Sequence, residues 1–271
     1  MGVSWLAAVL SAAGVAAPPP ADAPLPARPA ALAAQLQAAD DTLDAEAARW
    51  RAEGFDERRP APEPELWALR QQRILRMLAR RPALSRRVEA LLPAVDRGRA
   101  RSILVAMRSL ARLTASDRRR LPKVRVGLPL SPPDLRRHYR DAQRRFGVGW
   151  HILAAVNFVE TAFGKLRNES TAGARGPMQF MPATWRAYGM GGDVRDPRDA
   201  IMGAANYLRA SGAPRDYRRA LYAYNPSSLY VEAVRRYARL LDRDADAFAA
   251  LWMWSVYWDG RRVSGPGTPS A

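Results

Sequence analysis

The chain has 271 residues, 48% of them hydrophobic, which is enough for a large globular core and argues against wholesale disorder. It contains no cysteine, which excludes disulfide frameworks, thiolate nucleophiles and cysteine-bearing zinc sites. The formal net charge of +17 predicts attraction to polyanions such as nucleic acid, anionic lipid or an acidic wall polymer. The two histidines, His138 and His151, have no Asp or Cys at metal-ligand spacing. We therefore expect no metal site and no cofactor.

Residues 1–17 are an uncharged apolar run that ends in small residues. This composition is typical of a signal-peptide core, with Val15-Ala-Ala17 as its cleavage site. Because no basic residue precedes the run, the alternative is an uncleaved membrane anchor. Either interpretation predicts an extracytoplasmic protein, secreted or held in the cell envelope. Residues 18–31, rich in proline and alanine, are predicted to be an extended linker.

The next region, residues 32–127, is predicted to be helical. A first helix is expected from Leu32 to Trp50, before the break Pro60-Ala-Pro-Glu-Pro64. From Leu66 to about Leu113, apolar residues recur at the 3.6-residue period of amphipathic helices. Several arginine clusters lie in this region, Arg80-Arg81 among them, and we interpret them first as solvated faces and second as polyanion contacts.

From residue 128 to 258, helical patterns follow one another with short polar breaks and almost no two-residue alternation, so the predicted fold class is mainly α. Asp196 and Asp216 are placed to cap the helices that follow them. The aromatic segment 248–258 is expected to pack back on this domain. Residues 259–271 are expected to be a flexible tail.

A helix predicted from Trp150 to Phe163 carries one residue of unusual type, Glu160, among the apolar neighbours Phe158 and Val159. Burial disfavours the ionised form of a carboxyl group, so the pKa of Glu160 should be raised enough to keep a proton near neutrality. A general acid requires this property. A lone glutamate near a helix end can also be a salt-bridge or capping partner. The surrounding motifs therefore decide between a catalytic and a structural role for Glu160.

Three motifs follow in order: Asn157-Phe-Val-Glu-Thr-Ala-Phe-Gly164, Ser170-Thr-Ala-Gly-Ala-Arg-Gly-Pro-Met-Gln-Phe-Met-Pro-Ala-Thr-Trp185, and Ala223-Tyr-Asn225. Together they resemble the soluble lytic transglycosylases, in which a helix ending in Glu-Ser precedes a Gly-x-x-Gly-Leu-Met-Gln-x-Met-Pro segment and an Ala-Tyr-Asn turn. The resemblance covers roughly residues 131–241. It implies the lysozyme-like helical fold of goose-type lysozymes for the domain at 128–258.

The resemblance also implies roles for individual residues. Glu160 would be the catalytic acid and base, and Tyr224 would orient it. The other candidates would contact the substrate or shape its groove: Ser170, Met178, Gln179, Tyr222 and Asn225. This sequence departs from the family pattern at Thr161 in place of serine, at Pro177 in place of leucine, and at Pro226 after the Tyr-Asn pair.

The implied reaction cleaves the β-1,4 bond between N-acetylmuramic acid and N-acetylglucosamine in peptidoglycan and leaves a 1,6-anhydro product. A glycosidase that uses water needs a second carboxylate, and only Asp193 is a candidate here. Three alternatives stay open: a hydrolytic muramidase with water as acceptor, a non-catalytic cell-wall-binding module, and a basic nucleic-acid binder. The predicted export signal and Glu160 argue against both the non-catalytic module and the nucleic-acid binder. The expected partners are glycan strands and anionic wall polymers, whereas the sequence does not indicate an oligomeric state.

Overall fold

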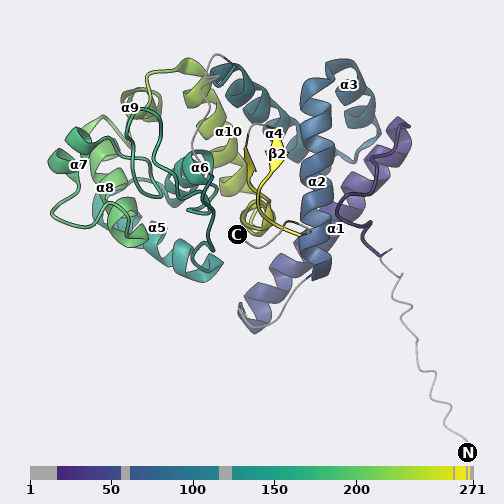
Figure 1. Ribbon diagram of the computed structural model, residues 1–271, viewed down its shortest axis with the longest axis horizontal. Helices are drawn as coiled ribbons and strands as arrows, with labels where there is room; N and C mark the ends of the chain where they lie inside the picture. Colours follow the sequence, from purple (N-terminus) through teal and green to yellow (C-terminus); the bar gives the residue numbers. More distant parts are fainter. Residues whose placement is uncertain (1–16, 56–61, 116–123, 259, 267, 269–271) are drawn as a thin grey trace, which may run out of the picture.

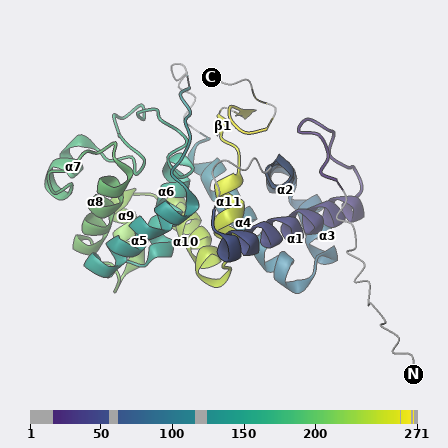
Figure 2. The same ribbon diagram turned by 90° about the horizontal axis from the view of Figure 1, so that it is seen from below.

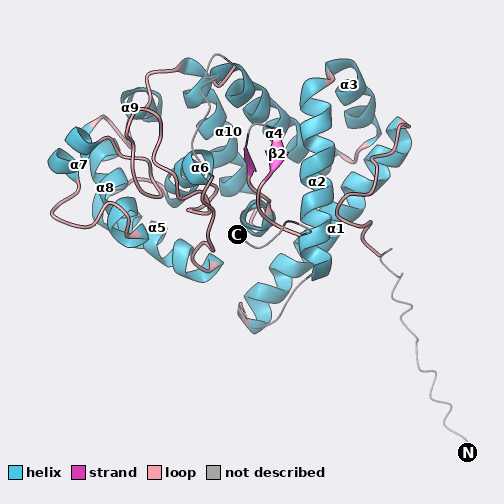
Figure 3. Cartoon of the chain, in the orientation of Figure 1, coloured by secondary structure: helices cyan, strands magenta, loops and turns pink. Residues whose placement is uncertain are grey.

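The computed structural model describes residues 17–55, 62–115, 124–258, 260–266 and 268. These residues form eleven α-helices and one short β-hairpin (Figures 1 and 3), which confirms the prediction of a mainly α protein. None of the helices in this part of the chain combines the length and the apolar character needed to cross a bilayer. The predicted signal peptide or anchor lies outside the described residues except for Ala17.

Four helices precede the predicted catalytic domain: α1 (Pro29–Glu53), α2 (Pro62–Arg80), α3 (Pro82–Leu91) and α4 (Ala94–Leu113). Three of them begin with proline, whose fixed φ and missing N–H suit the first helical position. Their apolar stripes face one another, and Leu36, Leu43 and Leu78 are almost completely buried between them. The predicted helices of residues 32–113 are therefore present, with boundaries shifted by a few residues.

The remaining helices are α5 (Pro132–Phe146), α6 (Trp150–Thr161), α7 (Pro182–Tyr188), α8 (Pro197–Ala210), α9 (Tyr217–Tyr224), α10 (Ser228–Arg243) and α11 (Ala247–Met253). Side-chain caps start several of them. Asp196 accepts from the backbone N–H of Asp199 at 2.9 Å, and Asp216 accepts from that of Arg219 at 2.9 Å. Both caps were predicted, because they depend on residues three positions apart in the sequence.

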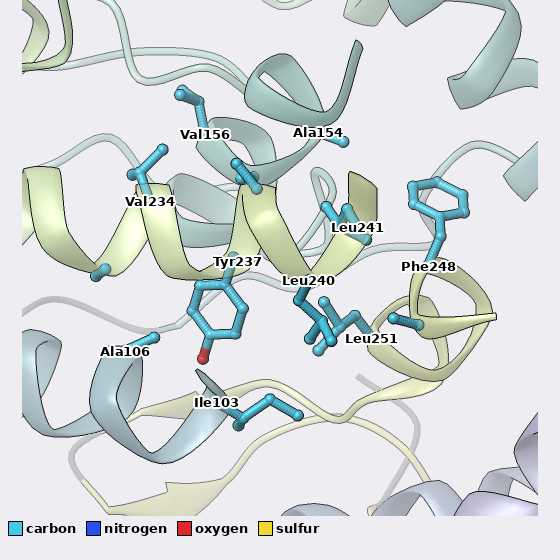
Figure 4. Close-up of a cluster of buried hydrophobic side chains, with 14 of the residues drawn as sticks. Ile103, Ala106, Ala154, Val156, Val234, Tyr237, Leu240, Leu241, Phe248 and Leu251 are labelled. Carbon is cyan, nitrogen blue, oxygen red and sulfur yellow. The ribbon is translucent and has the colours of Figure 1, made fainter. Parts of the chain in front are cut away.

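Helix α10 lies at the centre of the molecule and packs against α4 on one side and α6 on the other (Figure 1). In Figure 4, Tyr237 of α10 lies next to Ile103 and Ala106 of α4, and Val156 of α6 lies near Val234. All five of these side chains are at most 2% exposed. The N-terminal helices thus share one hydrophobic core with the helices that follow.

Both ends of the described chain are ordered against α2 and differ from expectation. Residues 17–28 lack regular structure, as predicted, yet they do not form a free tether, because Arg70 donates hydrogen bonds to the carbonyl groups of Ala23 and Pro24. The expected flexible tail contains a strand, β2 (Arg261–Arg262), paired antiparallel with β1 (Tyr257–Trp258). Figure 2 shows this hairpin beyond α11, on the same side as the N-terminal segment. The proline-rich composition predicted that residues 17–28 form no helix, but it did not indicate these contacts.

The aromatic segment after α10 packs inward, as expected. Phe248 and Trp254 are each 2% exposed. Trp254 donates its indole N–H to Gln71 of α2 at 2.7 Å, and Gln72 exchanges two hydrogen bonds with the backbone of Ser255. These bonds fasten the C-terminal segment to the N-terminal helices.

Candidate active site

Glu160 lies in the last turn of α6, a helix held on nearly all sides by protein. Residues 152–157 of α6 are all buried, so the helix has no room to shift. The Glu160 side chain is only partly buried and keeps access to solvent. Glu160 thus lies, partly buried, at the end of a helix that is fixed by its packing.

The chain turns abruptly after Glu160. The sequence predicted a helix up to Phe163, but α6 ends at Thr161, and the next three residues are left-handed, with φ of 49° at Ala162, 63° at Phe163 and 84° at Gly164. Left-handed backbone is unfavourable for residues other than glycine and persists only where the surroundings impose it. Phe163 supplies that restraint, because its ring is 2% exposed and packs 5.2 Å from the ring of Phe248.

Tyr230 of α10 contacts the carboxyl group directly. Its hydroxyl donates a hydrogen bond of 2.7 Å to Oε1 of Glu160, and its side chain is 1% exposed. Burial raises the pKa of Glu160 to about 7, while the Tyr230 hydrogen bond acts in the opposite direction by favouring the carboxylate. At neutral pH both protonation states are populated, so Glu160 can give a proton and take one back.

A buried hydrogen-bond network fixes the loop that faces the end of α6. Asn157 and Thr161 both donate to the carbonyl oxygen of Pro177, at 2.8 and 2.6 Å. Tyr139 donates to Asn157 Oδ1 at 2.6 Å, and Thr161 Oγ1 accepts from the N–H of Gly164 at 2.9 Å. Thr161, one of the departures from the family pattern, thus provides the hydroxyl that joins the helix end to the loop.

Within this loop, Gly176 could not be another residue without rearrangement. Its φ is +73°, and a Cβ atom there would lie 1.8 Å from the carbonyl oxygen of Val194. Gln179 is left-handed as well, with φ of 50°, and its amide group donates to the carbonyl of Gly176 at 3.0 Å. Ser170 accepts from the N–H of Ala174 at 2.9 Å, so its hydroxyl oxygen closes the start of the loop.

Met178 corrects one expectation. Its side chain is 0% exposed and belongs to the core, so it cannot line a groove. Its carbonyl oxygen instead accepts a hydrogen bond of 2.7 Å from the hydroxyl of Tyr224. The expected hydrogen bond from Tyr224 to Glu160 is therefore not formed, and Tyr230 donates to Glu160 instead. The ring of Tyr224 stacks parallel to that of Tyr230, with 6.5 Å between the ring centres.

Aromatic rings continue outward from this pair. Tyr207 lies 5.7 Å from Tyr224, and Tyr188 lies 4.8 Å from Tyr207, both as tilted pairs. The row of four tyrosines thus runs from Glu160 to the partly exposed rings on α7 and α8. Tyr222 is separately exposed, at 52%. Asn225 ends α9 and donates its backbone N–H to the carbonyl of Leu221 at 3.0 Å.

The other acidic candidates have their own partners. Glu169 forms ion pairs with Arg175 at 3.3 Å and with Arg195 at 2.9 Å. Asp193 is exposed and accepts from the backbone N–H of Arg195 at 2.8 Å. The pKa of Glu160 responds to burial and to Tyr230, with no contribution from another carboxylate of the described residues.

One group of carboxylates has the spacing of a metal site: Asp44, Asp244 and Asp246. A cation is already there, because the Arg99 guanidinium lies 3.0 Å from Asp44 and 2.7 Å from Asp244. The cluster joins α1, α4 and the turn before α11, away from Glu160. It serves as a structural ion-pair network.

Comparison with known proteins agrees with this geometry. Residues 138–246 match the model of the family described as Transglycosylase SLT domain. This part of the chain is similar to transglycosylase SLT domains. It contains most of α5 and all of α6 to α10, and with them Glu160, Tyr224 and Tyr230. The resemblance noted from the three motifs is thereby confirmed.

A curated relative also matches. The chain is 32% identical over 130 residues to the membrane-bound lytic murein transglycosylase F of Thiobacillus denitrificans. The matched region is 45% of this chain and 27% of the relative, so the chain spans only about a quarter of that protein. No solved structure matches the chain.

Proposed function

We propose that the SLT domain is a peptidoglycan lytic transglycosylase and that it cleaves the β-1,4 bond between N-acetylmuramic acid and N-acetylglucosamine. The observation that carries the proposal is the partly buried Glu160, whose carboxyl has a pKa of about 7 and accepts a hydrogen bond from Tyr230 within the region that matches this family. The similarity to a lytic murein transglycosylase supports the same activity.

In the first step, protonated Glu160 donates its proton to the bridging oxygen as the bond from that oxygen to C1 of the muramic acid breaks. Positive charge develops at C1, and the neighbouring N-acetyl group of the same sugar stabilises it. The Tyr230 hydroxyl stabilises the carboxylate formed on Glu160, because it donates to Oε1.

In the second step, the Glu160 carboxylate accepts the proton of the C6 hydroxyl while the C6 oxygen bonds to C1. The product is a 1,6-anhydro ring, and Glu160 regains its proton. Since the substrate supplies both the stabilising group and the nucleophile, a single carboxyl group suffices.

Substrate contacts are proposed on the same elements. The partly exposed rings of Tyr188 and Tyr207, at the outer end of the tyrosine row, offer aromatic faces against which sugar rings can pack. We assign exposed Tyr222 and the polar groups of Ser170, Gln179 and Asn225 to contacts with the glycan strand. Met178 is left out of this set, because its side chain is buried.

The proposed place of action is the cell envelope. Residues 1–17 would act as export signal or anchor, and the net charge of +17 would hold the protein on anionic wall polymers. We propose residues 32–127 as a helical scaffold for the domain at 128–258, because α4 packs along α10, which carries Tyr230.

The Glu160→Gln variant tests the assignment. Loss of a general acid and base should lower the rate of glycan release from purified sacculi by at least ~10²- to 10⁴-fold. The matched control is Glu169→Gln, which removes an exposed carboxylate paired with arginines on the neighbouring loop. A Glu160→Gln variant with the wild-type rate would refute the role.

A further inference from the structure

A concave site lies outside the region that matches the SLT family. It is a cavity of about 250 Å³ between the last turns of α2 and the C-terminal hairpin. Four arginines line it, Arg73, Arg76, Arg80 and Arg81, together with Tyr257 of β1. All five residues lie outside the SLT domain, which spans residues 138–246.

Helix geometry explains why the arginines converge. Arg73, Arg76 and Arg80 are three and four residues apart, so they lie on one face of α2. Arg81 follows directly, at the start of α3. The Arg76 guanidinium lies 3.8 Å from the centre of the Tyr257 ring, which holds it flat against the hairpin.

The positive charge of this cavity is not neutralised by the described residues. None of the four arginines forms an ion pair there, although Arg49, Arg99 and Arg262 each do so elsewhere. Asp22, the acidic residue that influences Tyr257, is 84% exposed and pairs with Arg262 at 2.9 Å.

The environment of Arg76 also indicates positive charge that is not compensated. Burial lowers the pKa of Arg76, and the like charge of Arg80 lowers it further. Burying a guanidinium next to another one is unfavourable unless an anion joins them. Arg73 donates to the carbonyl of Ala21 at 2.6 Å, which leaves the rest of its planar N–H set for a ligand.

We propose that this cavity binds a phosphate group. Planar guanidinium groups bind phosphate oxygens in pairs, and several of them match the charge and oxygen count of a phosphate better than those of a single carboxylate. The volume lies just below the ~300–1,000 Å³ of typical small-molecule pockets, so the site fits one small charged group rather than a nucleotide. The phosphate of a wall polymer, of a lipid headgroup or of a soluble metabolite shares this chemistry.

Calorimetric titration of the full chain with inorganic pyrophosphate tests the proposal. We expect saturable binding at one site. Arg80→Gln and Arg76→Gln should each weaken it about tenfold or more, as loss of a hydrogen bond to a charged group does. Arg80 is exposed, so that variant should fold normally. The matched control is Arg87→Gln, which removes the same charge from an exposed position of α3 outside the cavity and should bind like wild type.

Competition identifies the source of the phosphate. Displacement of pyrophosphate by phosphatidylglycerol vesicles would indicate a lipid headgroup. Displacement by soluble poly(glycerol phosphate) would indicate a wall polymer. If neither displaces pyrophosphate, the ligand is a small soluble phosphate. Each result supports the site. Absence of saturable binding would overturn the proposal. Equal weakening by Arg87→Gln and Arg80→Gln would also overturn it, because such a result reflects only the net charge.

Discussion

Replacing Tyr230 by phenylalanine should move the pH dependence of the reaction. The hydroxyl donates a 2.7 Å hydrogen bond to Glu160, and this bond favours the ionised carboxyl. A hydrogen bond to a charged group contributes ~1.5–3 kcal/mol, and one pKa unit corresponds to ~1.4 kcal/mol. Loss of the bond should therefore raise the pKa of Glu160 by about one to two units.

The general acid must be protonated, so kcat/KM of the wild type should fall as the pH rises through about 7. In Tyr230→Phe this alkaline limb should move upward by about one to two pH units, together with a lower maximum rate because the carboxyl is less well held. The assay is the initial rate of glycan release from purified sacculi at a series of pH values from acid to alkaline.

Tyr224→Phe is the matched control for this experiment. It removes a hydroxyl from the neighbouring stacked ring, but that hydroxyl donates to the Met178 carbonyl. Its alkaline limb should keep the wild-type midpoint, whatever happens to its maximum rate. An unmoved limb in Tyr230→Phe, or equal shifts in both variants, would refute the reasoning.

Two further predictions concern stability and adsorption. Burial raises the pKa of Glu160 from 4.5 to about 7, so the folded state binds this proton more tightly than the unfolded chain does. The resulting stabilisation of the folded state is fully present below pH 4.5 and is lost as the pH rises through 7. Glu160→Gln should accordingly be about 3 kcal/mol more stable than wild type at pH 8 and nearly equal to it at pH 4 in urea unfolding; a pH-independent difference would contradict this. Adsorption to isolated sacculi should weaken as salt is raised, because the charge of +17 acts through a screened field, and salt-insensitive pull-down would count against it.

Local features of this fold could be predicted from the sequence. The caps Asp196 and Asp216 act on N–H groups three residues away, so both were predicted correctly. The predicted break at residues 60–64 was only partly right, because α2 already begins at Pro62. The rise in the pKa of Glu160 was also predictable, because α6 is apolar around it. Each of these depends on residues close in the sequence.

The partner of Glu160 could not be found in this way. Tyr230 lies in the apolar stripe of α10, where its spacing indicates core packing, and its hydroxyl meets a carboxyl 70 positions earlier only after α10 packs on α6. Met178 shows the opposite error. Its motif suggested a groove contact, yet the left-handed turn at Gln179 and the bond from Tyr224 to its carbonyl leave its side chain in the core.

The docking of the chain ends was hidden for the same reason. Proline content indicated that residues 17–28 form no helix, but Arg70, more than forty positions later, supplies their hydrogen bonds. Arg262 likewise reaches back to Asp22 across nearly the whole chain. Composition describes the local backbone, whereas these contacts depend on where α2 lies.

The most direct test of the account is the mass of the glycan ends released from purified sacculi by the wild-type protein. Attack by the C6 hydroxyl predicts 1,6-anhydro muramic acid ends, lighter by one water than hydrolysed ends, and their loss in Glu160→Gln. Reducing ends alone would contradict the single-carboxyl mechanism and indicate water as the acceptor.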